Sequence, residues 1–245
     1  MLLQETTRGA DASFDLVRFS LPLAHTARRI AGPEPLKVVA IGSSSTEGAG
    51  GTVPYPHLLE IVLKARFPRL LITVLNHGKG GEEAGDELAR FRRDVLAEEP
   101  ALVIWQVGTN AVWKHYDLSQ VAASIRAGLQ LLRDLPMDVV MMDPQYAPAV
   151  IQQPVDAERM VSLIAEAAGQ TSVNVFRRFA LMAYWNVIER VPFAQMISTE
   201  DDGTMLHQND WSYERVTQAL AAAITDATSS RAAANLADAS TRRIS

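Results

Sequence analysis

The chain has 245 residues, a length that fits one α/β domain with a full core or, at a stretch, two small domains. With 48% hydrophobic and 21% charged residues, its composition is that of an ordinary soluble globular protein. The net charge of −5 and the lack of a basic cluster interleaved with aromatic residues disfavour nucleic acid and anionic membrane as partners. Cysteine is absent, which excludes disulfides, thiolate catalysis and cysteine-based zinc sites.

Residues 1–35 are interpreted as an N-terminal arm that packs on the main domain, because the arm contains too many apolar side chains for a free tail. It is expected to end in a charged, turn-prone linker with Arg28, Arg29 and the stretch from Gly32 to Pro35. Acidic residues interrupt the first 20 positions, so no signal peptide is visible. The expected location is the cytoplasm by default, or the periplasm or exterior if a leader has been removed. No stretch approaches the length of a membrane span.

From Leu36 onward, short apolar runs alternate with longer segments of helical periodicity. The predicted strands are Leu36–Ile41, Leu71–Leu75, Leu102–Gln106, Val139–Met142 and Val173–Phe176. The predicted helices are Pro56–Arg66, Glu82–Leu96, Leu118–Leu132, Asp156–Ala168, Arg178–Val187 and Trp211–Ala227. Such alternation indicates right-handed βαβ units and a parallel sheet. We therefore predict one α/β domain over residues 36–228, followed by a frayed tail over residues 229–245.

The most informative stretch runs from Val38 to Gly48, where four apolar residues end at a glycine and a cluster of hydroxyls. This pattern is typical of a buried strand followed by a tight turn, and ligands bind at that end of the strands in open parallel sheets. A serine on such a turn can be held exposed as a nucleophile. The same residues also suit an ordinary polar turn or a phosphate-cradling loop, although they lack the P-loop and dinucleotide glycine patterns.

Polar residues in three other loops can converge with this turn. The glycine-rich segment from Asn76 to Glu82 runs from a strand into a helix N-terminus, and such turns direct backbone N–H groups at an anion. Gln106 to Asn110 places an amide side chain after the third strand, and Asp201 to His207 brings carboxylates and a histidine before the last helix. The four loops together supply the nucleophile, the base and the oxyanion donors that ester hydrolysis by serine requires.

The same four segments resemble, in order, the sequence blocks of the SGNH (GDSL-type) hydrolases. Gly42 to Gly48 resembles the Gly-Asp-Ser block, in which Ser44 aligns with the nucleophile. Gly81 matches the glycine that gives an oxyanion N–H, and Asn110 matches the asparagine that completes the oxyanion hole. His207 matches the histidine of the Asp-x-x-His block. The matches extend over about residues 36 to 227.

The resemblance implies a flavodoxin-like three-layer α/β/α sandwich with a mostly parallel five-stranded sheet in the order 2-1-3-4-5. It also implies a serine esterase in which Ser44 attacks, His207 acts as base and then acid, and Asp202 orients the imidazole. The oxyanion is held by Ser44 N–H, Gly81 N–H and the Asn110 side chain, and neither a cofactor nor a metal is needed. Small acyl esters are the expected substrates, with O-acetyl groups on carbohydrate as the first choice.

Three positions depart from the family pattern. Ser43 replaces the usual aspartate before the nucleophile, and Ala111 replaces the aspartate after the asparagine. The family places its acid three residues before the histidine, where this chain has Thr204. We therefore choose Asp202 as the acid, with Asp201 as the second choice.

Several residues have both a functional and a structural interpretation. Trp113 and Tyr146 either line the substrate pocket or pack against the core, and Gln145 either faces the substrate or belongs to a strand-end turn. Trp211 is interpreted as a packing anchor for the last helix. The other histidines complete no motif, lack metal-ligand spacing and are assigned structural or surface roles; they are His25, His57, His77 and His115.

Two alternatives to an acetylesterase remain open from the sequence. One is a thioesterase or lysophospholipase of the same family, which a profile of acyl-chain length would distinguish. The other is a non-catalytic glycan-binding module with the same fold, which covalent labelling by a fluorophosphonate would distinguish.

Overall fold

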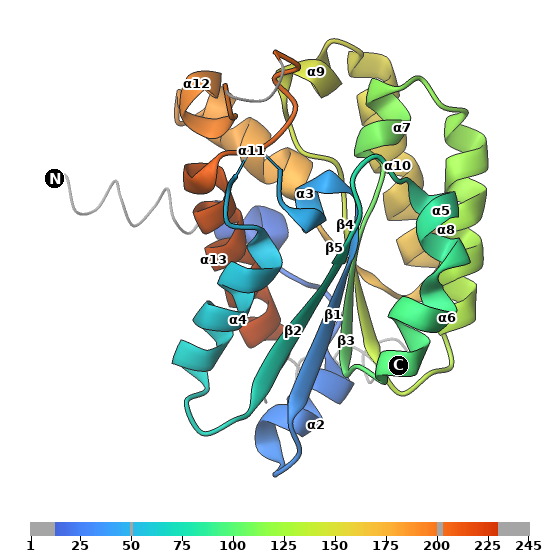
Figure 1. The fold of residues 1–245 in the computed structure, drawn as a ribbon, viewed down its shortest axis with the longest axis vertical. Helices are drawn as coiled ribbons and strands as arrows, with labels where there is room; N and C mark the ends of the chain where they lie inside the picture. The colour runs from blue at the N-terminus through green and yellow to red at the C-terminus, as the bar shows by residue number, and fades with distance from the viewer. Residues whose placement is uncertain (1–12, 50, 200–202, 230–245) are drawn as a thin grey trace, which may run out of the picture.

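A five-stranded, all-parallel sheet in the order β2-β1-β3-β4-β5 forms the middle layer of the molecule (Figure 1). The computed structural model describes residues 13–49, 51–199 and 203–229. Its strands are β1 (Leu36–Gly42), β2 (Ile72–Gly78), β3 (Leu102–Gln106), β4 (Asp138–Met142) and β5 (Asn174–Phe176). The predicted fold class and strand order are confirmed. Every residue of β3 is buried, as expected for a central strand that is covered on both faces.

Helices cover both faces of the sheet (Figure 1). On one face, α4 (Tyr55–Arg66) packs against α13 (Asp210–Ala227), and α11 (Arg178–Val187) lies beside them. On the other face, α8 (Leu118–Leu132) packs between α5 (Ala84–Ala89) and α10 (Pro154–Thr171). In the sheet, β2 lies on one side of β1 and β3 lies on the other side. Because crossovers between parallel strands are right-handed, connections that run in these two directions place their helices on opposite faces of the sheet. Within the described ranges, no helix has the length and apolar character needed to cross a bilayer.

The described part of the N-terminal arm lies against the domain. Val17 and Leu23 are buried, and the Asn174 side chain exchanges two hydrogen bonds with the backbone of Leu21. The expected linker is wrong in one respect, because Arg28 and Arg29 lie in the last turn of helix α2 (Ala24–Ala31). This helix is held at the amino end of β4, where Asp138 accepts hydrogen bonds from its first turn.

The predicted helix over Glu82–Leu96 is interrupted. The structure has α5, then α6 (Phe91–Asp94) and a 3₁₀ turn (Leu96–Glu98), with Arg90 outside helical geometry at φ −108° and ψ 5°. The Arg90 guanidinium lies 2.7 Å from carboxylate oxygens of both Glu82 and Asp94, and Phe91 packs edge-on against Trp105. The Arg90–Asp94 pair is local, whereas the packing of Phe91 on Trp105 and a hydrogen bond from Arg90 to the Gly42 carbonyl at 3.3 Å join the segment to β3 and β1. These two tertiary contacts cannot be read from the local sequence.

Short helices at the carboxyl edge of the sheet are absent from the sequence-based prediction. They are α3 (Ser44–Glu47), α7 (Thr109–Trp113), α9 (Pro148–Ile151) and α12 (Phe193–Met196). Each has only four or five residues, which is too short to establish a helical period. They lie at the end of the sheet where β1 leads into Ser44 and β3 leads into Asn110 (Figure 1).

Candidate active site

Ser44 is the first residue of α3, separated from the end of β1 by one residue and next to the point where the strand order reverses. Its Oγ atom lies 2.8 Å from Nε2 of His207, within hydrogen-bond distance. Ser44 is half-buried, whereas the neighbouring hydroxyl residues Ser43, Ser45 and Thr46 are buried. A hydroxyl paired in this way with an imidazole nitrogen has the arrangement of a nucleophile next to a general base.

The loop that carries His207 is fixed by hydrogen bonds on either side of the histidine. The carbonyl of His207 accepts from the N–H of Ser198 at 2.9 Å, and the carbonyl of Leu206 accepts from the Gln145 side chain at 3.2 Å. Asn209 then caps α13 by accepting from the N–H of Ser212. The imidazole is therefore presented from a backbone with little freedom to shift.

The predicted acids Asp201 and Asp202 lie outside the described residues. The structure describes the chain again from Gly203, which has a positive φ of 81° and thus belongs to a turn. Thr204, at the family's position for the acid, is half-buried. Because Nε2 of His207 faces Ser44, a group that orients the ring must lie at Nδ1.

The glycine-rich turn after β2 lies against the serine turn. The N–H of Gly80 donates to the Glu47 carboxylate at 2.7 Å, and a Cβ atom placed on Gly80 would lie 3.9 Å from that of Ser44. At Gly78 the two backbones approach so closely that a Cβ atom would collide with the backbone of Glu47. Among the described residues, the N–H groups of Ser44 and Gly81 have no acceptor, so both are available to an oxyanion.

The Asn110 side chain is buried and oriented by the same turn. Its Nδ2 donates to the carbonyl of Glu82 at 2.7 Å, which occupies one of two N–H bonds and leaves the second for a ligand. The buried carboxylate of Glu83 accepts from the N–H groups of Gly108 and Ala111, each at 2.8 Å, and so fixes the loop around Asn110. Burial raises the pKa of Glu83, and these N–H donors oppose that rise.

A comparison with known protein families shows which family the chain belongs to. The model of the non-GDSL lipase-like family matches residues 9–230, which is most of the chain. The chain belongs to the non-GDSL lipase-like family. This membership confirms the predicted relationship to the SGNH (GDSL-type) hydrolases and identifies the chain as an enzyme of that type. The family description also suits Gly42-Ser43-Ser44, which stands where the GDSL pattern has Gly-Asp-Ser.

Individual relatives of this non-GDSL lipase-like chain include an acetylxylan esterase from Geobacillus stearothermophilus. That protein is 28% identical over 169 residues, which cover 58% of this chain and 77% of the relative. Its crystal structure superposes with a TM-score of 0.61 at 22% identity, covering 79% of this chain and 94% of that one. A structure from Desulfitobacterium hafniense assigned to the G-D-S-L family of lipolytic proteins has a TM-score of 0.61 at 22% identity, covering 76% of this chain and 98% of that one.

The residues predicted to bind substrate differ in their surroundings. Gln145 is buried and engaged at both ends, because its Oε1 accepts from Thr109 at 3.0 Å and its Nε2 donates to the carbonyl of Leu206 at 3.2 Å. This arrangement favours a bridge between the asparagine and histidine loops over contact with a substrate. Trp113 and Tyr146 are half-buried, and the ring of Tyr146 packs edge-on against that of Phe179, with ring centroids 5.2 Å apart. Their contact with substrate stays a prediction.

A buried polar cluster beneath the serine turn is absent from the sequence-based prediction. The guanidinium of Arg178 donates to the carbonyl of Asp143, to Ser45 Oγ and to Gln208 Oε1. It therefore links the serine turn, the end of β4 and the residue after His207. Burial raises the pKa of Asp143 to about 7, although an N–H bond from Phe179 and the Arg178 charge lower it.

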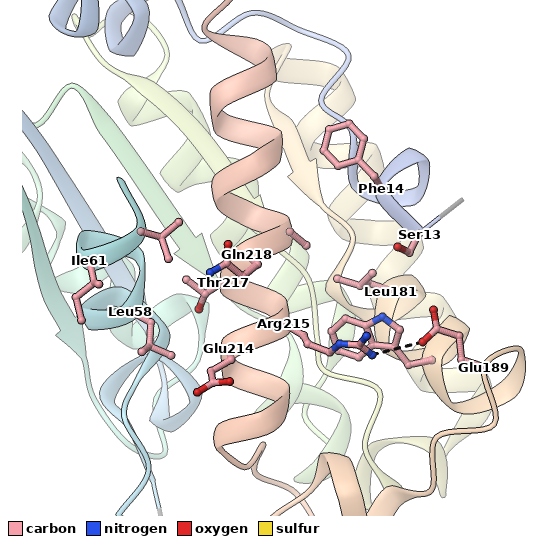
Figure 2. A pocket seen from close by; sticks show the side chains of 13 residues that line it. Ser13, Phe14, Leu58, Ile61, Leu181, Glu189, Glu214, Arg215, Thr217 and Gln218 are labelled. Carbon is pink, nitrogen blue, oxygen red and sulfur yellow. Dashed lines mark hydrogen bonds and ion pairs between the residues drawn. The ribbon is translucent and has the colours of Figure 1, made fainter. Parts of the chain in front are cut away.

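A groove of about 1310 Å³ lies along α13 on the outer face of the helical layer (Figure 2). Leu58 and Ile61 of α4 form one side, and Leu181 and Glu189 lie on the other, where Glu189 pairs with Arg215. None of the predicted site residues lines this groove. Beside it, Trp211 packs edge-on against Trp185 with ring centroids 5.6 Å apart, in keeping with its interpretation as a packing residue.

Proposed function

We propose that this protein is a serine esterase that removes small acyl groups, and in particular acetyl groups from carbohydrate hydroxyls. The observation that carries the proposal is the 2.8 Å contact between Ser44 Oγ and His207 Nε2 at the carboxyl edge of the sheet. The similarity to an acetylxylan esterase supports an acetylated carbohydrate as the substrate. Solved structures of that esterase include catalytic mutants in which a serine, an aspartate or a histidine is replaced by alanine, which supports the same residue types here.

In the proposed reaction, Ser44 Oγ attacks the ester carbonyl carbon while His207 Nε2 takes the hydroxyl proton. The tetrahedral intermediate then collapses, the bond to the sugar oxygen breaks, and His207 gives that oxygen its proton. An acetyl group remains on Ser44. Water attacks this acyl-enzyme with His207 again as the base, which releases acetate and restores both side chains. Protons and charges balance without a cofactor.

The negative charge of the intermediate is proposed to be held by three N–H donors. Ser44 N–H and Gly81 N–H are both available, and the second N–H of Asn110 completes the set. The Glu82 carbonyl and the Glu83 carboxylate hold Asn110 and its loop before substrate arrives. Donors fixed in advance stabilise developing charge without reorganising during the reaction.

The proposal is tested by labelling and by substrate profiling on the full chain. We expect a fluorophosphonate probe to label Ser44, and kcat/KM for p-nitrophenyl acetate to exceed that for the octanoate at least about tenfold, since a small acyl pocket loses longer chains. We also expect the protein to release acetate from acetylated xylooligosaccharides. Absence of labelling would instead indicate a glycan-binding module. A preference for long acyl chains or for thioesters would indicate a lysophospholipase or thioesterase and contradict the proposal.

Asp202→Asn tests the choice of acid. The substitution keeps the size of the side chain but removes the charge that would orient and stabilise the imidazolium of His207. We expect kcat to fall at least about tenfold, which corresponds to a barrier increase of about 1.4 kcal/mol or more. The measurement is steady-state hydrolysis of p-nitrophenyl acetate.

The matched controls are Asp201→Asn and Thr204→Val, which should have much smaller effects than Asp202→Asn. Activity near that of the wild type in both aspartate variants would show that no carboxylate orients His207. The enzyme would then be a Ser–His dyad whose imidazole is held by a backbone carbonyl.

A further inference from the structure

Gln106 ends β3 and reaches beneath the serine turn, where it is almost completely buried at 1% exposure. The close approach depends on Gly42, because a Cβ atom there would lie 2.8 Å from Gln106 Oε1 and 2.9 Å from Gln106 Cβ. A real carbon atom cannot occupy that position. The glycine at the end of β1 therefore leaves room for a side chain that crosses from the neighbouring strand.

Gln106 Oε1 has four donors within hydrogen-bond distance, and all belong to residues that flank Ser44. Ser43 N–H and Ser43 Oγ each lie 3.1 Å away, Ser45 Oγ lies 2.8 Å away, and Thr46 Oγ1 lies 3.1 Å away. A carbonyl oxygen has two lone pairs, so the hydroxyls share the acceptor while the backbone bond is fixed. Of the four consecutive hydroxyl residues in this turn, Ser44 is the one that faces His207 instead.

The surrounding donors also fix the orientation of the Gln106 amide. Arg178 can only donate, and its guanidinium lies 3.3 Å from Ser45 Oγ. The Ser45 hydroxyl therefore accepts from Arg178 and directs its own hydrogen to Gln106. This bond and the one from Ser43 N–H both need an oxygen at the position of Gln106 Oε1, so the opposite orientation of the amide would break both.

We propose that Gln106 is a positioning residue for the nucleophile: its carbonyl oxygen binds the turn on both sides of Ser44 and holds the serine hydroxyl and N–H in the geometry for attack. This inference rests on the proposed esterase function. It also accounts for the Ser43 departure, because the hydroxyl and N–H of Ser43 are directed to Gln106 and no aspartate is needed at that position. Gln106 touches no reacting atom and acts through the turn.

The test compares Gln106→Leu, which removes the acceptor, with Gln106→Glu, which keeps a carbonyl-type acceptor of the same length. We expect Gln106→Leu to lower kcat about 10- to 100-fold with little change in KM, because small misplacements of a nucleophile have effects of this size. The rate of fluorophosphonate labelling at Ser44 should fall in parallel. Gln106→Glu should restore both quantities to within about threefold of the wild type.

Asn174→Leu provides the matched control. It removes another buried amide, which bonds the backbone of Leu21 at the opposite end of the sheet, and it should lower the Tm without lowering kcat. If Gln106→Leu keeps wild-type kcat, if Gln106→Glu loses as much kcat as Gln106→Leu, or if Asn174→Leu loses it equally, the positioning role is wrong.

If Gln106→Leu does not fold, Gln106→Asn replaces it in the test. Asn withdraws the acceptor by one methylene, and a kcat equal to the wild type in that variant would also overturn the role. Labelling of the wild type separates this outcome from failure of the proposed function. If Ser44 is not labelled in the wild type, the proposed esterase function is contradicted. If the wild type is labelled and active, the Gln106 variants test only the positioning role of Gln106.

Discussion

Replacement of Ser44 by alanine is expected to abolish hydrolysis of p-nitrophenyl acetate and covalent labelling by fluorophosphonate. Loss of a serine nucleophile lowers kcat by about 10⁵-fold or more, because the remaining oxyanion donors act only on slow attack by water. The fold should be retained, since Ser44 is half-buried on a turn and its side chain contributes little to the core. Steady-state kinetics and a thermal melt of the same preparation measure both quantities.

Two serine variants provide the controls. Ser162→Ala alters an exposed helical serine on α10, and activity should not change. Ser43→Ala removes one of the four donors to Gln106 and should keep a substantial part of the activity. Near wild-type turnover in Ser44→Ala would rule out Ser44 as the nucleophile.

Asn110→Ala is expected to lower kcat by about 10²- to 10³-fold, the range for loss of one oxyanion donor. The effect on KM should be smaller, because the contact strengthens only as negative charge develops on the carbonyl oxygen. Asn110→Asp keeps the shape but has no N–H donor, so it should lose at least as much. Separate determination of kcat and KM for p-nitrophenyl acetate is the measurement.

Asn186→Ala is a close control for Asn110→Ala. The Asn186 amide also donates to a backbone carbonyl, that of Val191 at 2.9 Å, but it lies at the end of α11 and outside the proposed site. Its removal should leave kcat unchanged. A change in KM alone on Asn110→Ala would instead make Asn110 a substrate-binding residue.

The sheet was predictable because its strands are strongly apolar and bounded by turn residues. Leu102–Gln106, Leu118–Leu132 and Arg178–Val187 have the predicted bounds, and most other elements differ by a few residues at their ends. The break at Arg90 was not predictable, since Arg90 contacts the Gly42 carbonyl and Phe91 contacts Trp105 only after folding. The short helices of the carboxyl edge also leave too little periodicity to detect.

Some residues of the candidate site could likewise be predicted from the sequence, and others could not. Ser44, Gly81, Asn110 and His207 stand in sequence blocks with a recognisable spacing, so their positions at one edge of the sheet follow from the fold. The buried side chains that hold them have no such pattern. Gln106 is the single polar residue of β3 and lies at its carboxyl end, and Arg178 is the first residue of the largely apolar helix α11. Such isolated polar residues are a usable signal, but their partners become known only in three dimensions.

The backbone contact between Gly78 and Glu47 has a consequence for protein engineering. If the loops around Ser44 are randomised in a mutant library, the space available for a new side chain differs from one position to the next. Any side chain at Gly78 would push the serine turn away from β2, and one at Gly42 would displace Gln106, so active clones should retain glycine at both. Trp113 and Tyr146 are half-buried and are predicted to line the substrate pocket. Variation aimed at accepting larger acyl groups is best begun at those two aromatic positions, and a change in acyl-chain preference there would test their predicted contact with substrate.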